Sequence, residues 1–176
     1  MRRILTAGLG LVMAALMATL PASAATASDG SGAQGGWVPA PQAAFDLPAG
    51  ARCDFPVHSE PIVDEVRKLV LDTYPDGKPK RELYEGDLIL EITNTDTGAS
   101  TQADASGTAM IDYGTDGSMT WYVTGPVLLG FRENAGTLPR GLWIVDGVFI
   151  VEFTPDFYKT ITMIHGTTHN VCTDLD

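Results

Sequence analysis

Histidines are the side chains in this sequence best suited to bind a transition metal. There are three of them: His58, His165 and His169. A spacing of four places two rings on one face of a helix, but in an extended strand it separates them by about 13 Å. No carboxylate motif accompanies His165 and His169. We therefore interpret them as ordinary strand or surface histidines and expect no metal and no other cofactor.

Residues 112–117 are acidic and glycine-rich, as in a calcium-binding loop. When they are aligned with the helix–loop–helix calcium motif, Gly114 occupies the second ligand position and Val123 the bidentate one. Neither residue supplies a side-chain oxygen there. The segment predicts a hairpin turn instead, because it lies between two alternating runs.

Nucleophilic catalysis would require an activated serine or cysteine. No Gly-x-Ser-x-Gly motif occurs, and Ser118 directly follows an Asp-Gly turn signal. Carboxylates are abundant, and a pair of them could support glycoside chemistry. We interpret the following acids as a solvated strand face and turn: Glu82, Glu85, Asp87 and Glu91. No residue is assigned a catalytic role.

Tryptophan side chains can stack on sugars, and this chain has Trp37, Trp121 and Trp143. Trp121 shares its strand parity with Met119 and Val123, which predicts that it packs in the core. Trp143 precedes Ile144 and is expected to face outward. Trp143 is therefore the one candidate ligand-binding residue.

Short β-like runs, several of them alternating, are separated by turn residues from Cys53 to the C-terminus. The runs lie at 53–57, 65–74, 88–93, 108–113, 118–124, 127–131, 142–145, 148–153 and 157–165. The strongest turn signals between them are 75–77, 94–98, 114–117 and 146–147.

This pattern predicts an all-β fold of about nine short antiparallel strands. We favour a meandering barrel, because nearly every connection is short and closure removes exposed edges. A β-sandwich is the alternative. Residues 62–70 also fit a helical stripe, although their β-branched side chains favour a strand.

The N-terminus has the three parts of a bacterial signal peptide. Arg2 and Arg3 precede an apolar run, and Ala22 and Ala24 provide the small residues of a cleavage site. A retained membrane anchor is the alternative. We predict a signal peptide at 1–24, a flexible tether rich in Ala, Gly and Pro at 25–50, and a single domain at 51–176.

The chain is strongly acidic. Cleavage after Ala24 leaves nine of the eleven Lys and Arg against 22 Asp and Glu, a formal charge of −13. Such a surface repels nucleic-acid phosphates and anionic lipid headgroups. We therefore expect no nucleic-acid partner, and no membrane partner once the signal peptide has been removed.

Cys53 and Cys172 are the only cysteines. In an oxidising extracellular environment, paired cysteines usually form a disulfide. A reactive thiol pair would require closer spacing, as in Cys-x-x-Cys. We therefore predict one structural bridge that encloses nearly the whole domain.

The opening Cys53-Asp54-Phe55-Pro56-Val57, the turn at 74–77, the turn at 94–98 and the closing Cys172 together resemble small secreted actinobacterial proteins with a Cys-x-Phe-Pro-Val opening. The resemblance covers 53–172 and implies secretion, a disulfide and a β fold. It implies no site residues. The stretch 59–65 departs from the more compact start of that group.

Two functional hypotheses follow from the sequence. The first is a non-catalytic secreted or cell-wall-associated binding module, whose partner is an extracellular ligand or a wall component. The second is a small secreted enzyme with its active site inside a β-barrel. In that case His165, which has the same parity as Ile161 and Met163, would be the candidate base.

Overall fold

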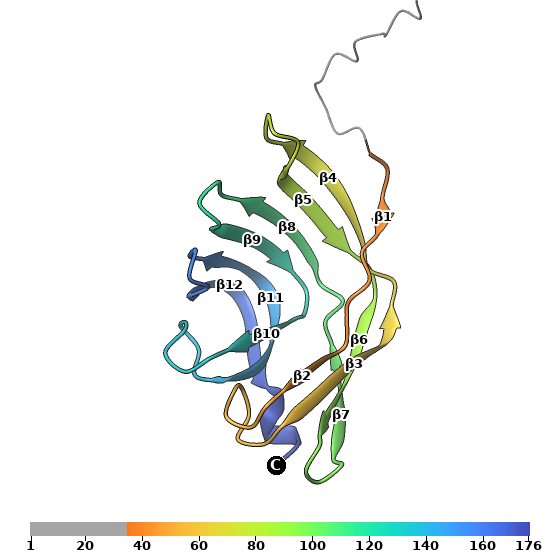
Figure 1. The fold of residues 1–176 in the computed structure, drawn as a ribbon, viewed down its shortest axis with the longest axis vertical. Helices are drawn as coiled ribbons and strands as arrows, with labels where there is room; N and C mark the ends of the chain where they lie inside the picture. The colour runs from red at the N-terminus through yellow and green to blue at the C-terminus, as the bar shows by residue number, and fades with distance from the viewer. Residues whose placement is uncertain (1–34) are drawn as a thin grey trace, which may run out of the picture. The chain divides into compact units, whose positions relative to one another are not determined.

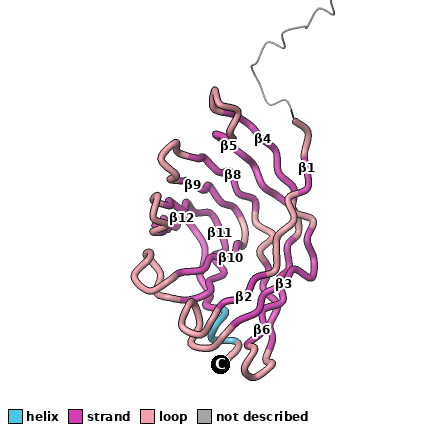
Figure 2. Tube along the Cα trace, in the orientation of Figure 1, coloured by secondary structure: helices cyan, strands magenta, loops and turns pink. Residues whose placement is uncertain are grey.

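The computed structural model describes residues 35–176, which form β-strands and one short 3₁₀ helix (Figures 1 and 2). The expected signal peptide at 1–24 and the first part of the expected tether lie outside the described residues. The elements are β1 (Val38–Pro39), β2 (Phe45–Leu47), β3 (Val57–Asp64), β4 (Arg67–Thr73), β5 (Pro79–Glu85), β6 (Leu88–Asn94), β7 (Ser100–Asp104), β8 (Thr108–Tyr113), β9 (Met119–Thr124), β10 (Val127–Phe131), β11 (Gly141–Phe153), β12 (Lys159–Asn170) and η1 (Val171–Asp174).

The strands form two antiparallel sheets. The larger has eight strands in the order β1-β4-β5-β8-β9-β11, with β10 and β12 both paired to β11. The smaller has four strands in the order β2-β3-β6-β7. The all-β, antiparallel prediction is confirmed, and the segment 62–70 is strand rather than helix.

Pairs of consecutive strands behave as single long strands that bend in the middle. β3 runs into β4, β5 into β6, and β7 into β8, so that each long strand passes from one sheet to the other (Figure 1). Gly86 lies at the second bend, where a Cβ atom would come within 2.3 Å of the Glu65 carbonyl oxygen. The absence of a side chain lets Glu65 N–H donate to Asp87 O at 2.8 Å.

The barrel prediction requires a correction. The larger sheet does not close, and residues 35–176 contain twelve strands rather than about nine. Among the strands of residues 35–176, β12 pairs with β11 alone, and the two-residue β1 lies at the other edge. β12 is exposed along much of its length and is rich in Thr and His. A polar edge strand is a second way to discourage pairing with other chains, and it does not require closure.

Two further expectations differ from the structure. The Asp146–Gly147 pair is not a turn, because β11 continues through it from Gly141 to Phe153. β5 and β7 were not expected as separate strands, since each has few apolar residues. By contrast, 75–77, 94–98 and 114–117 all form turns between paired strands, as predicted.

The segment expected to be a tether is partly ordered. β1 pairs with β4 and β2 pairs with β3, so 38–47 contributes to both sheets. The Arg67 guanidinium lies 4.7 Å from the centroid of the Trp37 ring, which holds the start of the segment against β4.

Apolar side chains gather in two clusters, one for each region of the fold. The first lies around the smaller sheet and η1 and includes Cys53, Val57, Ile92, Leu142, Val171 and Leu175. The second lies on β8 to β11 and includes Ile111, Val123, Phe131, Phe149, Val151 and Phe153. The predicted disulfide is confirmed: Cys53 and Cys172 are bonded, with 5.4 Å between their Cα atoms.

Candidate functional site

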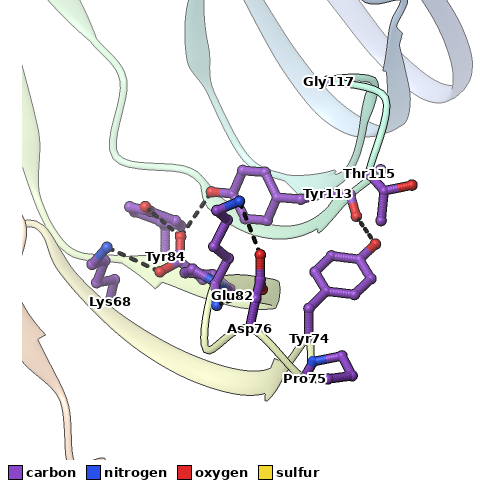
Figure 3. A pocket seen from close by; sticks show the side chains of 12 residues that line it. Lys68, Tyr74, Pro75, Asp76, Glu82, Tyr84, Tyr113, Thr115 and Gly117 are labelled. Atoms are coloured by element: carbon purple, nitrogen blue, oxygen red, sulfur yellow. Dashed lines mark hydrogen bonds and ion pairs between the residues drawn. The ribbon is translucent and has the colours of Figure 1, made fainter.

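An open groove of about 860 Å³ lies beside the hairpin turns that join β4 to β5 and β8 to β9 (Figure 3). Its walls include three tyrosine rings and two prolines. The tyrosines are Tyr74, Tyr84 and Tyr113, the prolines are Pro75 and Pro79, and Thr115 also lines the groove. Clefts with aromatic walls and a few fixed polar groups are the usual form of a small-ligand site.

Glu82 lies at the base of this groove and is only 2% exposed. Its Oε2 accepts hydrogen bonds from the hydroxyls of Tyr84 at 2.8 Å and Tyr113 at 2.7 Å. Its Oε1 accepts one from Lys68 Nζ at 2.9 Å (Figure 3). A buried carboxylate requires this degree of compensation, because an unpaired charge in the interior is very costly.

The four side chains set each other's protonation. Burial acts to raise the pKa of Glu82, but the hydrogen bonds from Lys68, Tyr113 and Tyr84 outweigh it and lower that pKa overall. The bond to Glu82 raises the pKa of Lys68. Burial and the bond to Glu82 raise the pKa of Tyr113 far above its ordinary value. At neutral pH the site therefore holds an anionic Glu82, a cationic Lys68 and neutral phenols.

Strand register brings these residues together. In the ladders Glu82 faces Ile111, while Tyr84 faces Lys68 on one side and Ala109 on the other. Since side chains of one parity share a face, Glu82, Tyr84 and Ile111 point the same way. Tyr113, two residues after Ile111, completes the set.

Tyr74 fixes the relative position of the two hairpins. Its hydroxyl donates to the carbonyl oxygen of Tyr113 at 2.5 Å, across 39 residues of sequence. Its backbone N–H donates to Lys78 O at 2.9 Å and closes the β4–β5 turn. The groove wall is therefore tied both to its own turn and to the neighbouring strand.

Glu82 was among the acids interpreted as a solvated face, and for Glu82 that interpretation is wrong. The alternation in β5 did not reveal it, because the apolar Leu83 faces the opposite side of the sheet. Lys68, Tyr74, Tyr84 and Tyr113 were not among the predicted site residues. These residues meet because strand 79–85 pairs with strand 108–113, and the sequence pattern does not reveal which strands pair.

Trp143, the sequence candidate for ligand binding, lies outside this groove. It is partly buried against the second apolar cluster, and its Nε1 donates to Pro139 O at 3.0 Å. Trp121 packs in the same cluster, with its ring centroid 4.8 Å from that of Phe153, which agrees with its predicted place in the core.

The histidines lie apart from the groove. His58 pairs with Asp46 and His169 with Asp174, at 2.7 and 2.8 Å. His165 is exposed rather than inward-facing, because the ladder skips Ile164: Val148 faces His165 and Phe149 faces Met163. This irregularity reverses the parity that placed His165 with Met163.

The chain has no match among protein-family models, curated proteins or solved structures. Within residues 35–176 the single helix is η1, and no helix there is long and apolar enough to cross a bilayer. The disulfide is compatible with an extracellular protein.

We expect Glu82→Gln to lower the free energy of unfolding at pH 7 by about 1–3 kcal/mol, because it removes the charge from three hydrogen bonds. A carboxylate with a depressed native pKa stabilises the fold above its unfolded pKa, near 4.5, and loses this effect as pH falls through the native value. In urea unfolding, the difference between wild type and variant should therefore shrink on going from pH 7 to pH 3.

Glu85→Gln is the matched control, since the carboxylate of Glu85 pairs with the more exposed Arg67. We expect it to cost about 0.5 kcal/mol or less. A difference between wild type and Glu82→Gln that stays constant from pH 7 to pH 3 would contradict the assigned ionisation of Glu82.

Proposed function

We propose that this protein is a non-catalytic secreted module that binds a glycan of the bacterial cell wall in the groove between the two hairpins. The observation that carries the proposal is the composition of the groove. Tyr74, Tyr84 and Tyr113 line it together with two prolines, and Asp76 and Lys78 add charges of both signs.

The groove offers stacking surfaces and hydrogen bonds, and these contacts suit a sugar better than an ionic ligand. Tyrosine rings offer flat apolar faces with a polar hydroxyl at the edge, and a sugar ring presents the same combination. Asp76 and Lys78 form an ion pair at 2.9 Å, so their net charge is zero. The groove thus has polar contacts to offer without a strong excess of either charge.

The interpretation as a binding module rests on the state of Glu82. A general base needs an acceptor that is free to take a proton. Both carboxylate oxygens of Glu82 already accept hydrogen bonds from Lys68, Tyr84 and Tyr113. Those bonds hold the groove wall rigid, which is what a preorganised binding surface requires.

An extracellular location follows from the predicted signal peptide and is compatible with the disulfide. A wall-associated protein exposed in this way would meet glycan chains as its most abundant neighbours.

Binding can be tested by retention on purified actinobacterial cell-wall glycan. Thr115 is exposed on the turn at the groove, so Thr115→Arg should obstruct the site and lower retention by about tenfold without unfolding the domain. Ala99→Arg is the control, because it adds the same charge at the β6–β7 turn, which lies at the opposite end of the strands (Figure 1).

Trp143→Phe provides a further arm, since Trp143 is the candidate from the sequence. If Trp143→Phe reduced retention while Thr115→Arg did not, the ligand site would lie at Trp143 and the groove proposal would be wrong. Equal loss with Thr115→Arg and Ala99→Arg would point to charge rather than to the groove.

The alternative function is a small secreted enzyme. It is favoured by one observation: Glu82, Lys68 and Tyr113 all have perturbed pKa values beside an open cleft, as catalytic groups often do. Incubation with the same glycan distinguishes the two functions. Soluble fragments that form with wild type and not with Glu82→Gln would establish the enzyme.

A further inference from the structure

Six of the nine basic side chains within residues 35–176 form ion pairs with carboxylates. These six are Arg67, Lys68, Lys78, Lys80, Arg81 and Arg140. In that part of the chain, Arg52, Arg132 and Lys159 have no carboxylate partner within ion-pair distance. This is unexpected in a protein with 22 acidic residues, where each cation has many candidate partners.

The three unpaired cations gather around the end of β10, although they come from three separate segments. Arg132 directly follows Phe131, the last residue of β10. Lys159 Nζ lies 5.4 Å from the centroid of the Phe131 ring. Arg52 Nε lies against Gly130, where a Cβ atom would approach it to 2.7 Å.

The position of Lys159 is fixed by its backbone. Its N–H donates to Ala135 O at 3.1 Å, and its carbonyl oxygen accepts from Thr137 N–H at 2.9 Å. These bonds attach the start of β12 to the β10–β11 connection. The ammonium also lies 5.6 Å from the Phe153 ring centroid, and two aromatic faces partly replace the water that it has lost.

Like charges at this place repel one another. Burial lowers the pKa of Lys159, and Arg52 and Arg132 lower it further. Burial also lowers the pKa of Arg52, with a contribution from Arg132. The pKa of Asp156 is lowered mainly by a hydrogen bond that its carboxylate accepts from Thr154 Oγ1 at 2.5 Å, and the charge of Arg132 lowers it further.

We propose that Arg52, Arg132 and Lys159 form a binding site for a single phosphate group. Two guanidinium groups and one ammonium supply donors in several directions, which matches the oxygens of a tetrahedral oxyanion. A bound phosphate would neutralise the mutual repulsion of the three cations. This site does not depend on the glycan proposal, because it shares no residue with the groove.

The ligand is a compact phosphate rather than a polyanion. With a formal charge of −13 after signal cleavage, the rest of the surface repels an extended chain of phosphates. Free inorganic phosphate and the terminal group of a phosphate monoester carry the same chemistry. Glycerol phosphate tests the second source, and a polyphosphate chain is expected to bind more weakly than either at low ionic strength.

Thermal unfolding of the purified full chain tests the site. At a phosphate concentration ten times Kd, we expect Tm to rise by about 4–6 °C over sodium chloride of equal ionic strength. Arg132→Gln should weaken phosphate binding at least about tenfold, which reduces the specific part of this rise to about a third or less. Arg132 is exposed, so this variant should fold normally.

Lys159→Gln is the second variant, and Lys80→Gln is the matched control. Lys80→Gln removes the same charge from an exposed pair with Asp72 and should keep the full response to phosphate. Phosphate also stabilises proteins in general by exclusion from their surface. An equal Tm rise in wild type, Arg132→Gln and Lys80→Gln would therefore overturn the proposal, as would no phosphate-specific rise in wild type.

Discussion

Replacement of both cysteines by alanine is expected to lower the free energy of unfolding by about 4–5 kcal/mol. The bridge joins residues 119 apart, and closing so long a loop removes much of the conformational freedom of the unfolded chain. Cys53 precedes β3, which is a strand of the smaller sheet. Cys172 lies in η1, which follows β12, a strand of the larger sheet. The bridge therefore connects the two sheets.

The native contacts around the bridge should weaken as well. Val171 and Leu175 of the C-terminal segment pack in the same apolar cluster as Cys53. The side-chain amide of Asn94 donates to Leu175 O at 3.0 Å in a buried position. Without the covalent bond, these contacts alone hold the C-terminus over the smaller sheet, and we expect it to detach before the rest of the domain unfolds.

Urea unfolding of the wild type with and without a reductant provides the measurement, with the double alanine variant as a reference. The reduced wild type and the double variant should have similar, lower midpoints. If reduction left the wild-type midpoint unchanged, the bridge would contribute nothing to stability, and the entropic argument would fail for this chain.

Local turn chemistry predicted a large part of this fold. Asp76-Gly77 and Asp116-Gly117 each lie in a hairpin turn between two strands. In each turn the glycine has the positive φ that other residues rarely adopt. Period-two alternation also placed Trp121 correctly, because its strand has no irregularity between Met119 and Val123. These features depend on a few neighbouring residues, and a sequence records such features directly.

The missed features depend on contacts between distant segments. Glu82 is stable in the interior only because Lys68 and Tyr113 reach it from two other strands. The skipped residue Ile164, which is 68% exposed, reverses the parity of His165. Barrel closure was inferred from short connections, but closure also needs the two edge strands to meet, which no local pattern specifies.

The Asp146–Gly147 pair shows why a turn signal can mislead. Gly147 has φ near +131°, a conformation that suits glycine, yet it lies within a strand of thirteen residues. Its ladder partner is Gly166, with φ near +146°. The two glycines allow β11 and β12 to approach closely at this point, and Gly125 N–H donates to Gly147 O there at 2.8 Å.

Gly147→Ala is therefore expected to destabilise the domain by about 3 kcal/mol, the second-largest effect that we predict. An added Cβ would lie 2.1 Å from the His165 carbonyl oxygen and 2.6 Å from the Gly166 Cα. Both are backbone atoms of the paired strand, so no side chain can rotate away to relieve the contact. The strand pairing itself would have to open.

Gly117→Ala separates the cost of the steric contact with the paired strand from the cost of backbone strain at a positive φ. Gly117 also has a positive φ, near +91°, but an added Cβ there would meet no atom within 4 Å. It should lose only about 1–2 kcal/mol, from backbone strain alone. Urea unfolding of the two variants measures the difference. Equal losses would mean that close approach of β11 and β12 at Gly147 is unimportant, whereas a larger loss at Gly147 would show that this approach requires glycine.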